Sequence, residues 1–127
     1  VTIVNGALWK ENTILNFSSD SSNGDCSYVS DLETENTVRG FKLDDIVKNE
    51  RVTFIKMDVE GFEREAIWGA SQNISRYSPK LMVSLYHRNE DIFELPLLIK
   101  SLNPNYKLYI RHQLYIPAWE TNLYAVP

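Results

Sequence analysis

The chain contains few of the residues that stabilise small secreted domains or bind nucleic acid. Its 127 residues include one cysteine, Cys26, so no disulfide can form within the chain, and we expect a reducing compartment, the cytoplasm. The net charge is −4 and the pI is near 5.1, so no broad basic face is available for a phosphate backbone. The composition therefore argues against a disulfide scaffold and against nucleic acid as a partner.

Long apolar runs and targeting signals are also missing. Charged or polar residues interrupt every apolar stretch before it could span a membrane, and the first residues have neither the basic nor the apolar region of a signal peptide. We therefore expect no membrane partner. Because the chain lacks an initiator methionine and opens inside a predicted strand, we expect a fragment of a longer protein, with residues 1–127 in a single domain.

The short motifs of several common enzyme classes are absent. The sequence contains no GxGxxG, GxxxxGK[ST] or GxSxG, so nothing indicates dinucleotide binding, triphosphate binding or serine hydrolysis. The HxH, HExxH and CxxC spacings of metal sites are absent as well. Candidate functional residues must therefore be sought where the predicted fold brings polar side chains together.

Strand and helix patterns alternate along the second half of the chain. The segment 52–59 reads as a strand covered on both faces, and the helix after it has Phe62 and Ala66 inward and Glu63 outward. Pro96 is placed in the first turn of a later helix, where its missing N–H costs little. We expect strands at 1–8, 13–17, 38–41, 52–59, 81–86, 106–111 and 121–126, and helices at 43–47 (with an acidic outer side), 62–70 and 92–102.

The order of these elements predicts an α/β fold. Alternation implies a mostly parallel, doubly wound sheet, and the final two strands imply an antiparallel C-terminal hairpin around a loop that contains Pro117. Residues 18–37, rich in Ser, Asn, Asp, Gly and Glu, are expected to form a long polar loop.

Acidic residues gather where the most apolar strand ends. Asp58 and Glu60 follow at the edge where such sheets bind ligands, Gly61 permits a sharp exit, and Glu63 comes in the next turn. Crowded carboxylates raise one another's pKa and suit proton transfer or cation binding. Two structural explanations stay open: a capping box of Glu60 and Glu63, and an ion pair of Asp58 with Lys56 on the same strand face.

A histidine follows the next predicted strand. His87 could emerge at the same edge as Asp58, and its ordinary pKa suits a general base. A lone histidine at a strand end also serves as a structural hydrogen-bonding group. Asp58, Glu60 and His87 could together bind a metal, although no spacing motif supports such a site.

The segment FIKMDVEGFE, from Phe54 to Glu63, resembles the FIKxDVEGxE segment of FkbM family methyltransferases. The resemblance covers nearly the whole chain, is dense from about Phe41, and implies a partial Rossmann-like class I methyltransferase fold of which this chain is the C-terminal part. Its further segments are Trp68-Gly69-Ala70, Pro79-Lys80-Leu81, Leu85-Tyr86-His87, 91–98, 106–112, 120–125 and, less specifically, Asn5-Gly6-Ala7-Leu8 and Leu43-Asp44-Asp45-Ile46.

This resemblance implies S-adenosyl-L-methionine (SAM) as cofactor and methyl transfer to an oxygen of a small-molecule or carbohydrate acceptor. Asp58 or His87 would be the catalytic base. The family's glycine-rich turn and ribose-binding acid would precede Val1, so we expect the fragment alone to bind SAM weakly or not at all, and the intact protein to bind it. The implied cofactor-binding residues are Asn5, Ala7 and Leu8 near the adenine, and Asp58 and Glu60 near the methionine end.

Two other functions stay open from the sequence. An FkbM-like domain without catalysis would bind a sugar or a protein partner. A metal-dependent hydrolase or nuclease would use Asp58, Glu60 and His87 as metal ligands.

Overall fold

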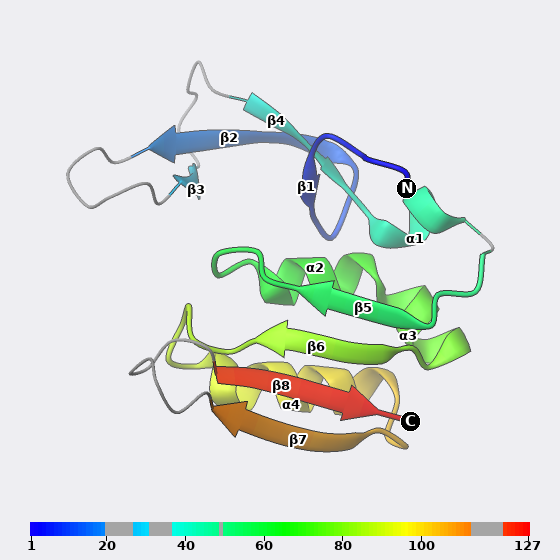
Figure 1. Ribbon diagram of the computed structural model, residues 1–127. Coiled ribbons are helices and arrows are strands. Elements are labelled where there is room, and N and C mark those ends of the chain that lie inside the picture. Colours follow the sequence, from blue (N-terminus) through cyan, green and yellow to red (C-terminus); the bar gives the residue numbers. More distant parts are fainter. Residues whose placement is uncertain (20–26, 31–36, 49, 113–120) are drawn as a thin grey trace.

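Two four-stranded β-sheets form the framework of the chain (Figure 1). The structure is a computed structural model that describes residues 1–19, 27–30, 37–48, 50–112 and 121–127. The first sheet, in the order β1-β4-β2-β3, consists of β1 (Ala7–Leu8), β2 (Thr13–Ser19), β3 (Ser27–Ser30) and β4 (Thr37–Phe41). The second, in the order β5-β6-β8-β7, consists of β5 (Phe54–Met57), β6 (Lys80–Ser84), β7 (Lys107–His112) and β8 (Thr121–Val126). The helices are α1 (Leu43–Val47), α2 (Glu63–Gly69), α3 (Ser71–Tyr77) and α4 (Asp91–Leu102).

Strand directions make the second sheet mixed. β5 and β6 are parallel, as expected for strands joined through helices, whereas β8 is antiparallel to both β6 and β7. The predicted closing hairpin of β7 and β8 is therefore confirmed, and β7 runs in the same direction as β5 and β6. The sheet was expected to be mostly parallel, and this is wrong: only β5 and β6 pair in parallel, because β8 lies between β6 and β7 and is antiparallel to each.

Helices cover one face of the second sheet. Ile55 and Met57 point to the covered side, and α2 and α4 lie along that side in Figure 1. Phe54 is 54% exposed and Lys56 lies on the same open face, so β5 is not covered on both faces within the described residues. Successive side chains of a strand alternate between its faces. The buried core is Ile55, Met57, Ala66, Ile67, Ala70, Ile74, Leu81, Val83, Leu85, Leu95, Ile99, Tyr106, Leu123 and Ala125.

The first sheet begins later than predicted. Of the predicted strand 1–8, residues 1–5 form no strand. Only Ala7–Leu8 of this segment pairs with β4, in parallel. Val1 and Ile3 are exposed, and no strand among the described residues lies beside them to complete a ladder. The predicted strands at 13–17 and 38–41 are confirmed as β2 and β4.

The polar segment 18–37 differs from the expected loop. Ser27–Ser30 forms strand β3, which pairs antiparallel with β2. Backbone N–H and C=O groups make such a ladder, so a polar composition does not prevent it. The remainder of the segment lies outside the described residues, with the exception of its ends in β2 and β4. Cys26, Pro117 and Trp119 also lie outside them.

A buried carboxylate in α1 connects this helix to α3. Asp44 was expected on an acidic outer side, but it is 6% exposed and accepts hydrogen bonds from the backbone N–H groups of Gln72 (2.9 Å) and Asn73 (3.0 Å). Asn73 Nδ2 donates a further bond of 2.8 Å. Because Ala70 at the N-cap of α3 has no capping side chain, Asp44 supplies the cap from another helix. Asp45 alone fulfils the expected exposed position.

The helical region after β5 is divided in two. α2 ends at Gly69, and α3, which the sequence pattern did not predict, follows from Ser71. A Cβ at Gly69 would lie 2.0 Å from the carbonyl oxygen of Trp9, so only glycine permits this approach of α2 to the chain after β1. Pro96 lies inside α4 and not in its first turn. Because proline has no N–H, the carbonyl of Ile92, four residues earlier, loses its helical hydrogen-bond donor, and Ile92 is half-exposed. None of the described helices is long and apolar enough to cross a membrane.

Candidate functional site

A tight turn follows β5 and positions the acidic residues. The N–H of Phe62 donates to the carbonyl of Val59 at 3.2 Å, and the two central residues, Glu60 and Gly61, have φ angles of 53° and 91°. Two positive φ angles are typical of a type I′ turn. Glycine adopts this conformation freely, whereas Glu60 is held in it at a cost of about 1–3 kcal/mol. The backbone therefore fixes the direction of the Glu60 side chain.

The capping box expected of Glu60 and Glu63 is absent. The N-cap residue of α2 is Phe62, and Glu63 is the first helical residue. Glu63 is 0% exposed, which also corrects its expected outward position. Its Oε1 accepts a hydrogen bond from the N–H of Val59 at 3.0 Å and lies 2.8 Å from Nδ1 of His87. A buried carboxylate needs such partners, and the imidazole supplies one that the sequence pattern could not indicate.

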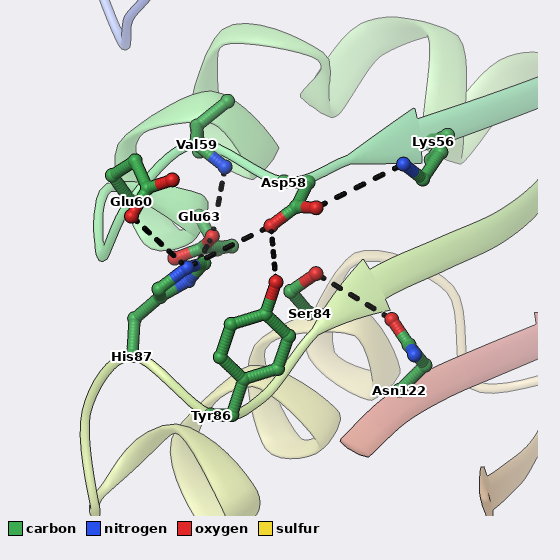
Figure 2. A network of polar contacts seen from close by, with 9 residues as sticks. All are labelled: Lys56, Asp58, Val59, Glu60, Glu63, Ser84, Tyr86, His87 and Asn122. Carbon is green, nitrogen blue, oxygen red and sulfur yellow. Dashed lines mark hydrogen bonds and ion pairs between the residues drawn. The ribbon is translucent and has the colours of Figure 1, made fainter. Parts of the chain in front are cut away.

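The imidazole of His87 connects the acidic residues (Figure 2). Its Nε2 lies 3.7 Å from Oδ1 of Asp58 and 3.4 Å from Oε2 of Glu60, and its side chain is 11% exposed. The structure therefore brings Asp58, Glu60 and His87 together as predicted, and adds Glu63. We call these four residues the carboxylate–imidazole cluster.

Asp58 makes the predicted ion pair with Lys56 and, in addition, contacts on the side of His87. Lys56 Nζ lies 3.8 Å from its Oδ2, a long ion pair whose side chains are 55% and 36% exposed. The hydroxyl of Tyr86 donates to its Oδ1 at 2.9 Å, on the side of His87. An exposed pair at this distance stabilises little. Asp58 therefore has one oxygen toward the imidazole and one toward solvent and Lys56.

Three polar residues beside the cluster were not predicted as site residues. Tyr86 could have been suggested only by its position next to His87 at the strand end. Ser84 and Asn122 are buried and face each other across β6 and β8, with Ser84 Oγ donating to Asn122 Oδ1 at 3.4 Å (Figure 2). Both had the appearance of ordinary strand residues in the sequence. They extend the polar end of the second sheet beyond Asp58.

The predicted cofactor-binding residues of β1 lie in the first sheet. Asn5 precedes the strand and is exposed, and Ala7 and Leu8 form β1. The chain then contacts the residue just before α2, because the rings of Trp9 and Phe62 lie 5.4 Å apart. Cofactor contacts of Asn5, Ala7 and Leu8 stay a prediction.

A second buried carboxylate lies behind the cluster. Asp91, the first residue of α4, is 4% exposed, and its Oδ2 has no hydrogen-bond partner among the described residues. Burial and the nearby charge of Glu63 raise the pKa of Asp91 from 3.8 to about 6, although Arg88 acts in the opposite direction. In the sequence it resembled an ordinary acidic residue at a helix start.

Asp91→Asn is expected to remove part of the pH dependence of stability. The unfolded chain has the ordinary pKa of 3.8 at this residue, so the folded protein binds an extra proton between about pH 4 and pH 6. The free energy of unfolding of the wild type should therefore fall by on the order of 2 kcal/mol as the pH rises through this range. Urea denaturation at about pH 4, 5 and 7 measures the slope. Glu94→Gln, at a half-exposed carboxylate, is the control, and equal slopes for wild type and Asp91→Asn would contradict the prediction.

A metal ion could be held by part of the cluster. Asp58, Glu63 and His87 each offer a ligand atom, and these atoms lie within 4.8 Å of one another. Glu63 was not in the predicted set, and the predicted Glu60, whose side chain is 69% exposed, lies at the rim with its Oε2 3.4 Å from Nε2 of His87. Carboxylate oxygen and imidazole nitrogen are ordinary ligands of divalent cations.

Comparison with known proteins gives two matches. A family model described as "Methyltransferase FkbM domain" matches residues 1–116. The crystal structure of methyltransferase FkbM from Methylobacillus flagellatus KT is similar at 34% sequence identity and a TM-score of 0.66, over 87% of this chain and 25% of that chain. The chain thus spans about a quarter of the length of the solved structure. Comparison with curated proteins gave no match.

Proposed function

The chain belongs to the FkbM methyltransferase family, and from this membership we propose that its protein transfers a methyl group from SAM to an oxygen atom of a small-molecule or carbohydrate acceptor. The observation that carries the proposal is the carboxylate–imidazole cluster at the carboxyl end of β5, inside the segment 1–116 that matches the family. Open α/β sheets bind ligands at this end of their strands.

We propose that the second sheet is part of a Rossmann-like class I methyltransferase sheet. Three of its strands, β5, β6 and β7, share one direction, and β8 runs against them between β6 and β7. The similarity in fold to the FkbM structure supports this interpretation.

The charge of the cluster fits a cationic cofactor. Asp58 and Glu60 are 36% and 69% exposed and carry negative charge, which attracts the positive sulfonium and amino groups of SAM. When bound, SAM supplies an electrophilic methyl group. Asp58 and Glu60 would hold its methionine end, and Asn5, Ala7 and Leu8 would lie beside the adenine.

Proton transfer is the task we assign to His87 and Asp58. A hydroxyl becomes a better nucleophile when a base accepts its proton as it reacts. Glu63 holds Nδ1 of His87 at 2.8 Å, so Nε2 faces the exposed side of the cluster. Either Nε2 of His87 or the neighbouring carboxylate of Asp58 would take up the proton of the hydroxyl group that is methylated.

The test is direct measurement of SAM binding and methyl transfer by the full-length protein. We expect calorimetry to detect SAM binding, and a panel of sugars and small hydroxy compounds to yield at least one methylated product when the methyl group of SAM is labelled. S-adenosylhomocysteine should compete with SAM, because it shares every part of the cofactor except the transferred methyl group. A full-length protein that binds neither compound would contradict the proposal.

A further inference from the structure

The arrangement of hydrogen bonds around His87 fixes where its protons lie. Oε1 of Glu63 is an acceptor for the N–H of Val59, and the same oxygen faces Nδ1 of His87 at 2.8 Å. When Glu63 is a carboxylate, Nδ1 carries the hydrogen and donates it to Glu63. In a neutral imidazole this leaves Nε2 with a lone pair.

That lone pair would face two carboxylate oxygens. Oε2 of Glu60 lies 3.4 Å from Nε2, and Oδ1 of Asp58 lies 3.7 Å from it. Three electron-rich atoms that face one another repel unless a positive charge lies between them. Either a second proton on His87 or a metal cation can supply that charge.

The distances favour a metal cation. A charged N–H group hydrogen-bonds a carboxylate at about 2.7–2.9 Å, which is shorter than both separations. Two ligands on one cation, each bonded at about 2.1 Å with an angle of roughly 90–110°, lie about 3.0–3.4 Å apart. The Glu60 separation of 3.4 Å is in this range, and the Asp58 separation of 3.7 Å is close to it.

The described residues balance the negative charge around the imidazole poorly. Glu63 is 0% exposed, and its second oxygen, Oε2, has no hydrogen-bond partner among the described residues. The cations nearby do not replace one: Lys56 is half-exposed and 3.8 Å from Asp58, and the guanidinium of Arg88 lies over the ring of Phe62 at 5.4 Å. Asp91 adds a carboxyl group on the buried side.

We propose that His87 Nε2 and the carboxylate of Asp58 bind a divalent metal cation, with Glu60 as a ligand from the solvent side. Glu63 then orients the imidazole through Nδ1, the carboxylate–histidine–metal arrangement found in many metal sites. One nitrogen and two carboxylates suit a cation such as Mn²⁺ or Zn²⁺.

The purpose of the cation rests on the proposed function. Asp58 and Glu60 are 36% and 69% exposed, so the cluster is open to solvent on this side, and the oxygen of the acceptor would approach the cation from there. A bound cation lowers the pKa of a coordinated hydroxyl. In the metal-bound site this replaces the base role proposed above for His87 and Asp58: both would be ligands of the cation, and the hydroxyl proton would pass to solvent.

Binding of Mn²⁺ to the full-length protein tests the site. After treatment with EDTA and dialysis, titration with MnCl₂ followed by electron paramagnetic resonance should show one bound Mn²⁺ per chain. His87→Gln and Asp58→Asn should each weaken binding at least 10-fold, and Glu63→Gln should weaken it about 10–100-fold as an orienting residue. Glu94→Gln, whose carboxylate pairs with Arg64 away from the cluster, should bind like the wild type.

Two results would overturn the site: no saturation up to about 1 mM MnCl₂, or equal affinity in the wild type and all three cluster variants. If His87→Gln loses its native circular dichroism spectrum, the Mn²⁺ affinity of Asp58→Asn tests the site instead. Asp58 is part-exposed and asparagine has the same size, so we expect this variant to fold. SAM binding measured with EDTA present separates the two proposals. Binding of Mn²⁺ without binding of SAM would contradict only the proposed function. Binding of SAM without binding of Mn²⁺ would contradict only the metal site.

Discussion

Asp58→Asn in the full-length protein is expected to lower the rate of methyl transfer by about 10²–10⁴-fold. The carboxylate lies 3.7 Å from His87 and accepts a hydrogen bond from the hydroxyl of Tyr86. Its negative charge is needed in both proposals, as the base in the proposed function or as a ligand in the proposed metal site. Asparagine keeps the size and can still accept the hydrogen bond from Tyr86, but it loses the charge. The measurement is the initial rate of transfer of labelled methyl groups at saturating SAM and acceptor.

The fold should survive this substitution. The Asp58 side chain is 36% exposed and its ion pair with Lys56 is long, so we expect the free energy of unfolding to change by less than about 1 kcal/mol. Glu94→Gln removes a carboxylate of similar exposure on the surface of α4 and should keep the wild-type rate. Wild-type turnover in Asp58→Asn would return Asp58 to a structural pair with Lys56.

Asp44→Ala should destabilise the chain by about 2–4 kcal/mol. It leaves two backbone N–H groups at the start of α3 and the side chain of Asn73 without their buried acceptor. Urea denaturation followed by circular dichroism measures the loss. Asp44→Asn should recover part of it, because one oxygen remains to accept a hydrogen bond.

The neighbouring Asp45 provides the matched control. It lies in the same helix and is exposed, with one surface hydrogen bond of 2.6 Å from Asn12. Asp45→Ala should cost no more than about 1 kcal/mol. Equal losses at the two positions would show that Asp44 acts through the helix α1 alone and not as the cap of α3.

Periodic patterns in the sequence predicted the elements around the site. A nearly continuous apolar run marked β5, although it suggested burial on both faces where only Ile55 and Met57 are buried. Helical spacing of Leu95 and Ile99 marked α4, because burial on one face imposes a period on the residues. The same apolar run placed Asp58 and Glu60 at the end of β5, and the resemblance to the FkbM family implied their roles near the cofactor. The structure brings His87 to them, as the parallel pairing of β5 and β6 requires.

Buried acids are what the sequence could not reveal. Glu63 and Asp44 both look like exposed helical residues, since each stands among polar neighbours. Their partners, His87 and Asn73, lie 24 and 29 residues further along the chain. No local pattern encodes such pairs, and only the tertiary fold distinguishes them from surface carboxylates.

The hydrogen bond between Glu63 and His87 also bears on how faithfully the protein folds. Strands β5 and β6 pair with Ile55 opposite Leu81, and a slip of one residue would turn every side chain of one strand to the other face. His87 would then leave Glu63 as a bare charge in the interior, at a cost of several kcal/mol. The buried pair therefore disfavours a misaligned pairing of β5 and β6 relative to the observed register.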